Sequence, residues 1–180
     1  MASFFFAMIT ALASFSVVLA DCNLANNLDS GPLPEVQSQL CLGQGAGAYT
    51  FSMDVSELDV PTFSSGAMWA GLVGGQAFMI YDESCTLKGV YSPHQTSDCG
   101  IPYVIEESWL SYVLAVTDVN FDTADPYFSF DYANGKYSIR NNGCVCNDIG
   151  SGLQVEKGCR CAFPINGESK RDVLSIPFEA

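Results

Sequence analysis

Four of the chain's eight cysteines lie in residues 141–163, "NNGCVCNDIGSGLQVEKGCRCAF", as two C-x-C pairs. The pairs Cys144/Cys146 and Cys159/Cys161 are placed symmetrically about residues 152–153. An antiparallel hairpin turning there would set Cys144 opposite Cys161 and Cys146 opposite Cys159. Because side chains two positions apart on a strand share one face, all four sulfurs would gather on one side of the hairpin. The spacing therefore predicts a β-hairpin held by disulfides.

Two disulfide arrangements fit this hairpin. The two C-x-C pairs can bridge each other, or each can reach to one of the other cysteines, Cys22, Cys41, Cys85 and Cys99. We favour the second arrangement, because closing longer loops stabilises a fold more in the chain-entropy picture. We also expect Cys85 to pair locally with Cys99, and Cys22 to fix the N-terminal end of the domain.

A metal site is the main alternative for four neighbouring thiols, since four thiolates can hold zinc in a tetrahedral arrangement. Zinc knuckles, however, use C-x2-C spacing, whereas both pairs here are C-x-C. The C-x-x-C spacing of redox sites does not occur in the sequence. We therefore expect structural disulfides, with neither metal nor cofactor.

The first twenty residues predict entry into an oxidising compartment. An apolar run from Phe4 to Leu19 ends in small residues before Asp21, as in a secretory signal peptide cleaved after Ala20. We expect residues 1–20 to be the signal peptide and residues 21–180 to be a single disulfide-rich β domain, secreted to the extracellular space. The alternative is an uncleaved membrane anchor, but the run is short for a membrane span.

The net charge of the chain limits the classes of molecule that it is expected to bind. The chain carries 20 acidic and 7 basic residues, for a net charge of −13. This excess repels nucleic acids and anionic membranes, and it favours solubility, cationic surfaces, polyamines or divalent metal ions. We therefore expect neither nucleic acid nor membrane as a partner.

Periodicity predicts a mostly β fold. Tyr49, Phe51, Met53 and Val55 alternate with polar residues in "AYTFSMDV", which predicts a strand with one buried and one wet face. In "YFSFDYANGKYSIR", a turn at Asn134-Gly135 predicts a hairpin that pairs two sets of residues. These pairs are Tyr132 with Tyr137, Phe130 with Ile139, Asp131 with Ser138, and Ser129 with Arg140.

Further strands are expected at residues 76–82, 86–92, 108–119, 152–158 and 172–178. The segment "LPEVQSQLCLG" (33–43) predicts one short helix near the N-terminus. The predicted fold is a disulfide-stapled antiparallel β-sandwich or barrel with that helix.

Candidate catalytic residues are few. His94 is the single histidine and lies in a loop without a G-x-S-x-G nucleophile motif. Glu106-Glu107 would point to opposite faces if they lay on a strand, which argues against a paired-carboxylate hydrolase. Asp118, Asn120 and Asp122 begin like a calcium loop, but Thr123 and Ser129 stand where an EF-hand needs Gly and Glu. Trp69 and Trp109, in apolar stretches, are expected to pack in the core.

One processing motif lies near the C-terminus. Lys170-Arg171 is a dibasic pair, and cleavage after it would release "DVLSIPFEA". The alternative is a solvated turn before a final strand, which we favour because residues 173–178 contain apolar side chains that a fold would bury.

The signal peptide, the eight cysteines with paired C-x-C elements, and the acidic β-rich composition resemble the small secreted cysteine-rich proteins of filamentous fungi. The resemblance extends along the chain as a class and matches no family-specific motif. It implies a non-enzymatic effector or virulence-type protein that binds a host or extracellular protein or glycan. The alternative is a secreted carbohydrate-active protein, either a polysaccharide hydrolase or a carbohydrate-binding module.

Secretion and complete oxidation can be tested together by intact-mass measurement of protein recovered from a eukaryotic secretion host. We expect a chain that starts at Asp21 and gains about 8 Da on reduction, the signature of four disulfides. The same spectrum distinguishes a chain ending at Ala180 from one ending at Arg171. Free thiols or a retained N-terminus would contradict the assignment to an oxidising compartment.

Overall fold

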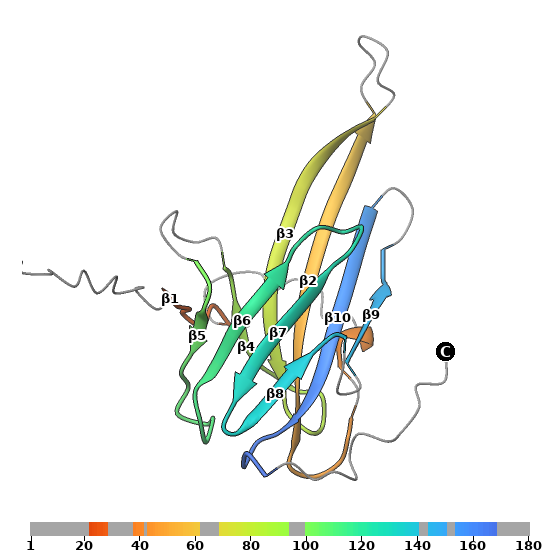
Figure 1. Ribbon diagram of the computed structural model, residues 1–180. Coiled ribbons are helices and arrows are strands. Elements are labelled where there is room, and N and C mark those ends of the chain that lie inside the picture. Colours follow the sequence, from red (N-terminus) through yellow and green to blue (C-terminus); the bar gives the residue numbers. More distant parts are fainter. Residues whose placement is uncertain are drawn as a thin grey trace, which may run out of the picture.

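The computed structural model describes residues 22–28, 38–41, 43–61, 69–93, 100–140, 144–150 and 154–168. These residues form ten strands in two five-stranded sheets, together with one 3-10 turn (Figure 1). The prediction of a mostly β chain is confirmed. The described strands form two layers and do not close into a barrel.

The first sheet has the order β1-β5-β6-β7-β8. Its strands are β1 Cys22–Asn23, β5 Tyr103–Ile105, β6 Leu114–Asn120, β7 Tyr127–Tyr132 and β8 Gly135–Ser138. β1 pairs with β5 in parallel, and the other neighbours are antiparallel. Cys22 is disulfide-bonded and lies in the edge strand β1, as expected for a residue that fixes this end of the domain.

The second sheet has the order β4-β3-β2-β10-β9 and is antiparallel throughout. Its strands are β2 Ala48–Pro61, β3 Trp69–Tyr81, β4 Leu87–Tyr91, β9 Val145–Asp148 and β10 Gln154–Pro164. The strands predicted at 76–82, 86–92 and 152–158 thus lie largely within β3, β4 and β10. The last predicted strand, 172–178, lies outside the described residues.

Aromatic rings from both sheets meet in the main core. Phe51 of β2 is fully buried, and its ring centroid lies 5.1 Å from Phe128 and 4.9 Å from Phe130, both on β7 of the other sheet. Phe78 of β3 lies 5.4 Å from Phe51 within the same sheet. Large buried rings of this kind supply most of the hydrophobic stabilisation that holds two sheets face to face.

The prediction of a wet face on β2 is wrong. Thr50 and Ser52 are 2% and 0% exposed, because β2 is the middle strand of its sheet and a second small core covers its outer face. That core consists of Leu40, Cys41, Met79, Tyr81, Val90 and Ile149. The Ser52 hydroxyl satisfies its hydrogen-bonding need by donating to the Leu40 carbonyl. Around Thr50 and Ser52, this sheet is therefore covered on both faces.

The N-terminal helix predicted at 33–43 is not found in the described part of that segment. Ser38–Leu40 forms a single 3-10 turn, η1, and Cys41 follows it in irregular structure. The remaining residues of the segment that precede this turn lie outside the described residues. Leu40 is 1% exposed on the outer face of β2, so tertiary packing and the adjacent disulfide fix this short turn.

The hairpin of β7 and β8 forms, but its predicted register is wrong by two residues. Tyr132 pairs with Gly135 and Phe130 with Tyr137, around the loop Ala133–Asn134. This register stacks the rings of Phe130 and Tyr137 at 4.8 Å. A shift of two keeps each residue on its predicted face, which explains why the alternation alone could not detect the error.

The same shift changes the polar pairs of this hairpin. Asp131 pairs with Lys136, with a 2.7 Å salt bridge, and Ser129 pairs with Ser138. Ala133 adopts a φ of 52°, in the left-handed region. An added Cβ on Gly135 would lie 2.6 Å from the Tyr137 hydroxyl oxygen, so the Tyr137 ring would have to shift to admit a side chain there.

The β9–β10 hairpin has the register that the symmetric cysteine spacing predicts. Cys146 lies opposite Cys159, and the two form a disulfide; Cys144 bonds to Cys161 in the same way. The arrangement in which these cysteines reach elsewhere in the domain is therefore wrong. Neighbouring strands place opposite residues within disulfide distance, so the hairpin geometry itself favours the cross-strand bonds.

The local pairing of Cys85 with Cys99 is also wrong. Cys85 bonds to Cys41, across a sequence separation of 44 residues, and thereby ties the segment after η1 to the β3–β4 turn. Cys99 lies outside the described residues. The Cys41 sulfur lies 3.7 Å from the buried Thr50 hydroxyl, so this long-range bond packs on the outer face of β2.

The residues 108–113 that were predicted as the start of a strand form a loop. β6 begins only at Leu114, and the chain before it turns through a hydrogen bond from the Leu110 amide to the Glu107 carbonyl. Trp109 in this loop stacks against Tyr49 at 6.1 Å. The Trp109 ring thus packs against an aromatic neighbour although it does not lie on a strand.

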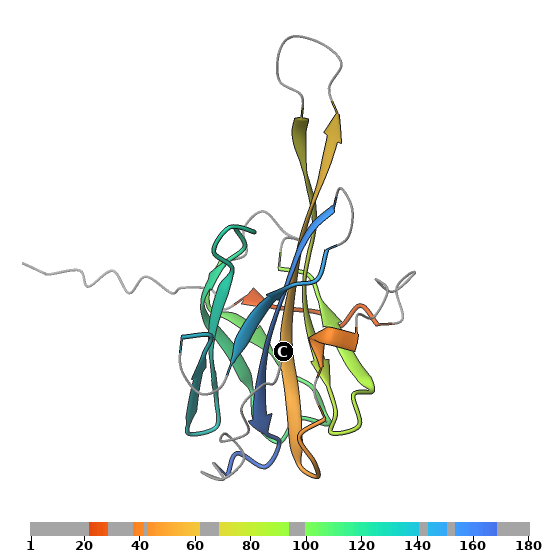
Figure 2. The same cartoon turned by 90° about the vertical axis from the view of Figure 1, so that its right-hand side faces the viewer.

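Two strands of the second sheet extend beyond the rest of the molecule. β2 and β3 remain paired from Glu57↔Val73 to Pro61↔Trp69, whereas β10 pairs with β2 only as far as Leu58. Figures 1 and 2 show these strand ends projecting as a two-stranded ribbon. We call Glu57–Pro61 and Trp69–Gln76 the ribbon.

The β9–β10 hairpin is so tight that Gly150 should be indispensable. A Cβ at this position would overlap the Gln154 carbonyl oxygen and lie 2.7 Å from the Glu156 amide nitrogen, both backbone atoms that cannot rotate away. We expect Gly150→Ala to lower the free energy of unfolding by about 1–3 kcal/mol, measured by denaturant unfolding. Gly100→Ala is the control, since no atom lies within 4 Å there. Equal stability of the two variants would contradict this hairpin geometry.

Candidate functional site

A pocket of about 330 Å³ lies in the loop between β5 and β6. Its lining residues are Glu106, Glu107, Ser108, Leu110, Ser111, Tyr112 and Val113. Figure 1 shows this loop at the end of the molecule opposite the projecting ribbon. The pocket therefore combines two carboxyl groups, two hydroxyl groups and an aromatic ring within one short segment. We call residues 106–113 the pocket loop.

Two apolar side chains of the pocket loop are unusually exposed. Tyr112 and Val113 are 50% and 45% exposed, and they are among the few large exposed apolar residues of the described chain. The Tyr112 ring packs edge-on against Tyr132 at 5.8 Å. The turn after β10 also lies against it, since a Cβ on Gly167 would lie 2.8 Å from the Tyr112 ring. Tyr112 is thus a supported aromatic surface rather than a free side chain.

The two glutamates of the pocket differ in their surroundings. Glu107 accepts a 2.9 Å hydrogen bond from the hydroxyl of Tyr91, which is fully buried. Burial, the hydrogen bond to Glu107 and the charge of Glu107 all raise the pKa of Tyr91. Glu106 is exposed at the pocket. The expectation that consecutive glutamates point apart on a strand does not apply, because both follow the end of β5 and line one pocket.

An aromatic pair flanks the pocket loop. Trp109 is half-buried and stacks with Tyr49, and the Lys88 ammonium lies 5.9 Å from the centre of the Trp109 ring. The prediction of a packing role for Trp109 fits this arrangement. The side chain of Trp69 lies outside the described part of the structure.

A second cluster of acidic groups lies on the outer face of the second sheet. Asp54 of β2 pairs with Gly158 of β10, and Glu156 lies diagonally next to it, opposite Ser56. Glu156 is 7% exposed, and its Oε2 atom accepts a 3.1 Å hydrogen bond from Gln154. Burial, the charge of Glu156 and a hydrogen bond with Glu156 raise the pKa of Asp54 to about 7. The Asp54 carboxyl therefore stays protonated over much of the acidic range.

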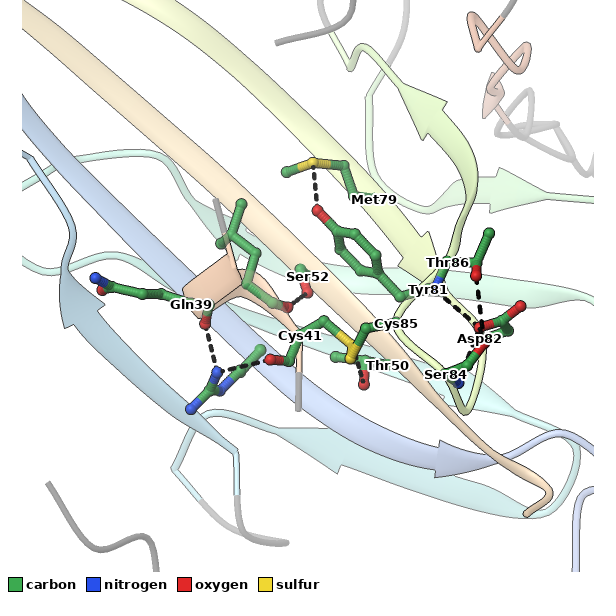
Figure 3. The surroundings of a disulfide bond; sticks show 12 residues. Gln39, Cys41, Thr50, Ser52, Met79, Tyr81, Asp82, Ser84, Cys85 and Thr86 are labelled. Atoms are coloured by element: carbon green, nitrogen blue, oxygen red, sulfur yellow. Dashed lines mark hydrogen bonds between the residues drawn. A yellow bond between two sulfur atoms is a disulfide. The ribbon is translucent and has the colours of Figure 1, made fainter. Parts of the chain in front are cut away.

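The outer face is closed on one side by the Cys41–Cys85 disulfide (Figure 3). Arg160 donates hydrogen bonds to the carbonyls of Gln39 and Cys41, the second at 3.2 Å. Tyr81 donates to the Met79 sulfur at 3.3 Å, and burial together with the charge of Asp54 raises its pKa to about 12. These contacts hold the segment Gln39–Cys41 against the outer face of the sheet, on which the Asp54–Glu156 pair also lies.

The acidic turn between β6 and β7 uses its oxygen atoms internally. The Asn120 side-chain oxygen accepts from the Asp122 amide at 3.2 Å, and Asp122 accepts from the Ala124 amide at 2.9 Å. Asp118 accepts from the Tyr127 hydroxyl at 3.1 Å. Among the described residues, no group of three or more His, Cys, Asp or Glu side chains is arranged to hold a metal ion.

Several residues singled out in the sequence lie outside the described residues: His94, Cys99, Lys170 and Arg171. No sequence pattern predicted the pocket loop or the Asp54–Glu156 pair. A signal for the loop existed in the run "EESWLSY", which mixes acids, hydroxyls and aromatics, but its apolar residues favoured a strand. Nothing local connects Asp54 with Glu156, because their proximity depends on the pairing of β2 with β10.

Comparison with known proteins identifies no relative: no family model matches the chain, and neither a similar curated protein nor a similar solved structure was found. Across the described residues, no helix has the length and hydrophobicity required to cross a bilayer. The three disulfides found within the described residues fit an extracellular protein.

The buried carboxyl pair predicts an unusual pH dependence of stability. The pKa of Asp54 is raised on folding, so the folded state binds more protons than the unfolded state between about pH 4 and pH 7. The contribution of this group to stability therefore falls as pH rises through that range. We expect Asp54→Asn to be more stable than wild type at pH 7.5, on the order of 1–3 kcal/mol, and to lose this advantage near pH 4.

Thermal unfolding of both proteins from pH 3.5 to 7.5 measures this difference. Asp82→Asn is the opposite-sign control, because the hydrogen bonds that Asp82 accepts from Ser84 and Thr86 lower its pKa despite some desolvation. That variant should be less stable than wild type at neutral pH, with the gap closing as the pH falls towards the Asp82 pKa. Parallel profiles for Asp54→Asn and wild type would show that folding does not raise the pKa of Asp54.

Proposed function

We propose that this chain is a secreted, non-enzymatic protein that binds an extracellular partner through the pocket loop. The observation that carries the proposal is the 330 Å³ pocket, which places an exposed aromatic ring beside two carboxyl groups. Binding residues are commonly presented on loops that a rigid scaffold supports. Here the scaffold is the two-sheet core with its cross-strand disulfides.

The charge of the site favours a basic partner. The chain has a net charge of −13, and the pocket adds Glu106 and Glu107 to a surface on which Tyr112 is half exposed. Carboxylates attract Lys and Arg side chains, and an aromatic face adds a cation–π contribution. We therefore infer that the partner is an extracellular protein that presents a basic segment.

Binding accounts for the two glutamates better than hydrolysis does. A glycosidase needs its two carboxyl groups on opposite sides of the bond that it cleaves. Glu106 and Glu107 are consecutive residues of one loop, and Glu107 is already fixed by the hydroxyl of Tyr91. Glu106 and Glu107 are therefore better placed to bind a charged partner at the pocket than to act as a catalytic pair.

Carbohydrate binding is the second candidate, and Tyr112 is the observation that favours it. Its ring is exposed yet supported by Tyr132, and Ser108 and Ser111 place hydroxyl groups in the same pocket. An exposed ring beside polar groups can stack on a sugar while they hydrogen-bond to its hydroxyls. The effector role follows from the class resemblance in the sequence, and either type of partner is compatible with it.

The two candidates differ in what they should bind and in their response to salt. We expect the protein to bind a Lys- and Arg-rich dodecapeptide in calorimetry, with an affinity that falls as salt is raised. We expect no binding to a neutral glucan hexasaccharide. Salt-insensitive binding of the hexasaccharide, without binding of the peptide, would replace the basic partner by a glycan.

Variants of the pocket loop locate the binding surface. We expect Tyr112→Ala and Glu106→Gln each to weaken peptide binding by about 5- to 20-fold, the size of a lost cation–π or charge contact. Asp118→Asn is the matched control for Glu106→Gln, because it removes one negative charge from the strand β6, outside the pocket loop. Equal weakening by Glu106→Gln and Asp118→Asn would show that net charge, rather than the pocket, determines binding.

A further inference from the structure

One long strand edge of the molecule has no partner within the described residues. β4 pairs with β3 only from Phe78 to Tyr81, so the edge of β3 from Trp69 to Ala77 faces no other described strand. β2 occupies the opposite edge of β3 along this length. The unpaired backbone N–H and C=O groups of such an edge are a template for another extended chain.

The other described sheet edges are protected or short. The edge of β4 is covered by the N-terminal segment, where Asn26 bridges to Tyr91 and the Asn27 amide donates to the Val90 carbonyl at 2.8 Å. The edge strands β1, β8 and β9 contain two, four and four residues. The ribbon is thus the one place in the described structure where a long edge remains open.

The sequence of this edge lacks two of the usual protections against pairing, charged residues and proline. The ladder with β2 does shift register between the pairs Val55↔Gln76 and Glu57↔Val73, at Gly74 and Gly75. Natural edge strands carry Lys, Pro or inward-pointing charges, or they bulge away from a neighbour. The segment "WAGLVGGQA" (69–77) contains no charged residue and no proline, in a chain of which 15% of residues are charged. A two-stranded ribbon is also marginally stable by itself, and a third strand would support it.

We propose that two copies of this chain associate through antiparallel pairing of their β3 edges, forming a four-stranded sheet from two ribbons. An antiparallel contact between identical strands is self-complementary about a two-fold axis, so it closes at a dimer. Charge selects this region for self-association: the chain carries −13, and the neutral edge is where two such chains can meet with least repulsion. The projection of the ribbon keeps the two acidic bodies apart (Figure 2).

The dimer leaves both pocket loops free, because they lie at the opposite end of each molecule from the ribbon (Figure 1). The association is a property of the ribbon and does not depend on the proposed binding function. Repulsion between the two acidic bodies should weaken the dimer at low ionic strength. Added salt should therefore strengthen it, opposite to the effect expected for the basic peptide.

Sedimentation velocity of the secreted protein, from 1 to 100 µM (about the range for a weak to moderate dimer), tests this proposal. We expect a monomer–dimer equilibrium whose dissociation constant falls between 50 and 500 mM salt. Leu72→Lys should raise that constant by about tenfold or more, since the two-fold axis brings two added charges near each other. Leu58→Lys is the matched control: Leu58 lies opposite Leu72 in the same ribbon, but on β2, away from the pairing edge.

Hydrogen exchange supplies a second measurement that does not depend on substitutions. Amides of residues 69–77 should become more protected as the wild-type concentration rises through the dissociation constant, whereas those of Ala48–Val55 should not change. A wild-type protein that stays monomeric at 100 µM and 500 mM salt would overturn the proposal. So would a dimer that Leu58→Lys and Leu72→Lys weaken equally, or one without added protection in residues 69–77.

Discussion

The antiparallel ladder between β2 and β10 is the interaction on which the rest of the structure depends. It joins Ala48 to Pro164 and continues without interruption to Leu58 opposite Gln154. One side of this ladder carries Phe51 and Phe163 into the main core, and the other side carries Ser52 and Arg160 beneath η1. β2 and β10 are far apart in the sequence. Neither core can therefore be completed until these two strands have paired.

The disulfides further stabilise the sheet that contains this ladder. They join residues at different sequence separations. Cys144–Cys161 and Cys146–Cys159 fasten β9 to β10 over short separations of 17 and 13 residues. Cys41–Cys85 closes a loop with a separation of 44 residues and holds the second core against the sheet. In the chain-entropy picture the long link removes more freedom from the unfolded chain, but the two short links fix the strand register directly. A compact acidic chain gains from both, since like charges oppose its folding.

Sequence patterns correctly predicted the register of β9 and β10 and the existence of β2. The symmetric spacing of Cys144, Cys146, Cys159 and Cys161 predicted the register of β9 and β10, because strand geometry alone relates those positions. The apolar alternation from Tyr49 to Val55 likewise predicted the strand and its inner face. It failed for the outer face, where Thr50 and Ser52 read as solvent-exposed but are covered by a segment attached through the Cys41–Cys85 bond. No local sequence pattern indicates that the Ser52 hydroxyl will be buried and will donate a hydrogen bond to the Leu40 carbonyl.

Two further errors, at the β7–β8 hairpin and in the pocket loop, have different physical causes. At the β7–β8 hairpin, the preference of Asn134-Gly135 for a tight turn was outweighed by the stacking of Phe130 on Tyr137, which moved the turn one residue earlier. In the pocket loop, the apolar residues around Trp109 suggested a strand. Trp109 instead lies in a turn, and its ring stacks on Tyr49 from there. A binding surface built on such a loop could be recognised only once the strands on either side of it had been placed.

The paired bonds of the β9–β10 hairpin also bear on how the chain would survive outside a cell. A protease that cut the backbone anywhere between Cys146 and Cys159 would sever the polypeptide but would not separate its two parts, because both disulfides span that interval. β10 would stay covalently attached to β9 and hydrogen-bonded to β2 along its whole length. A nick at the tip of this hairpin would therefore change the connectivity of the chain without detaching β10 from the sheet.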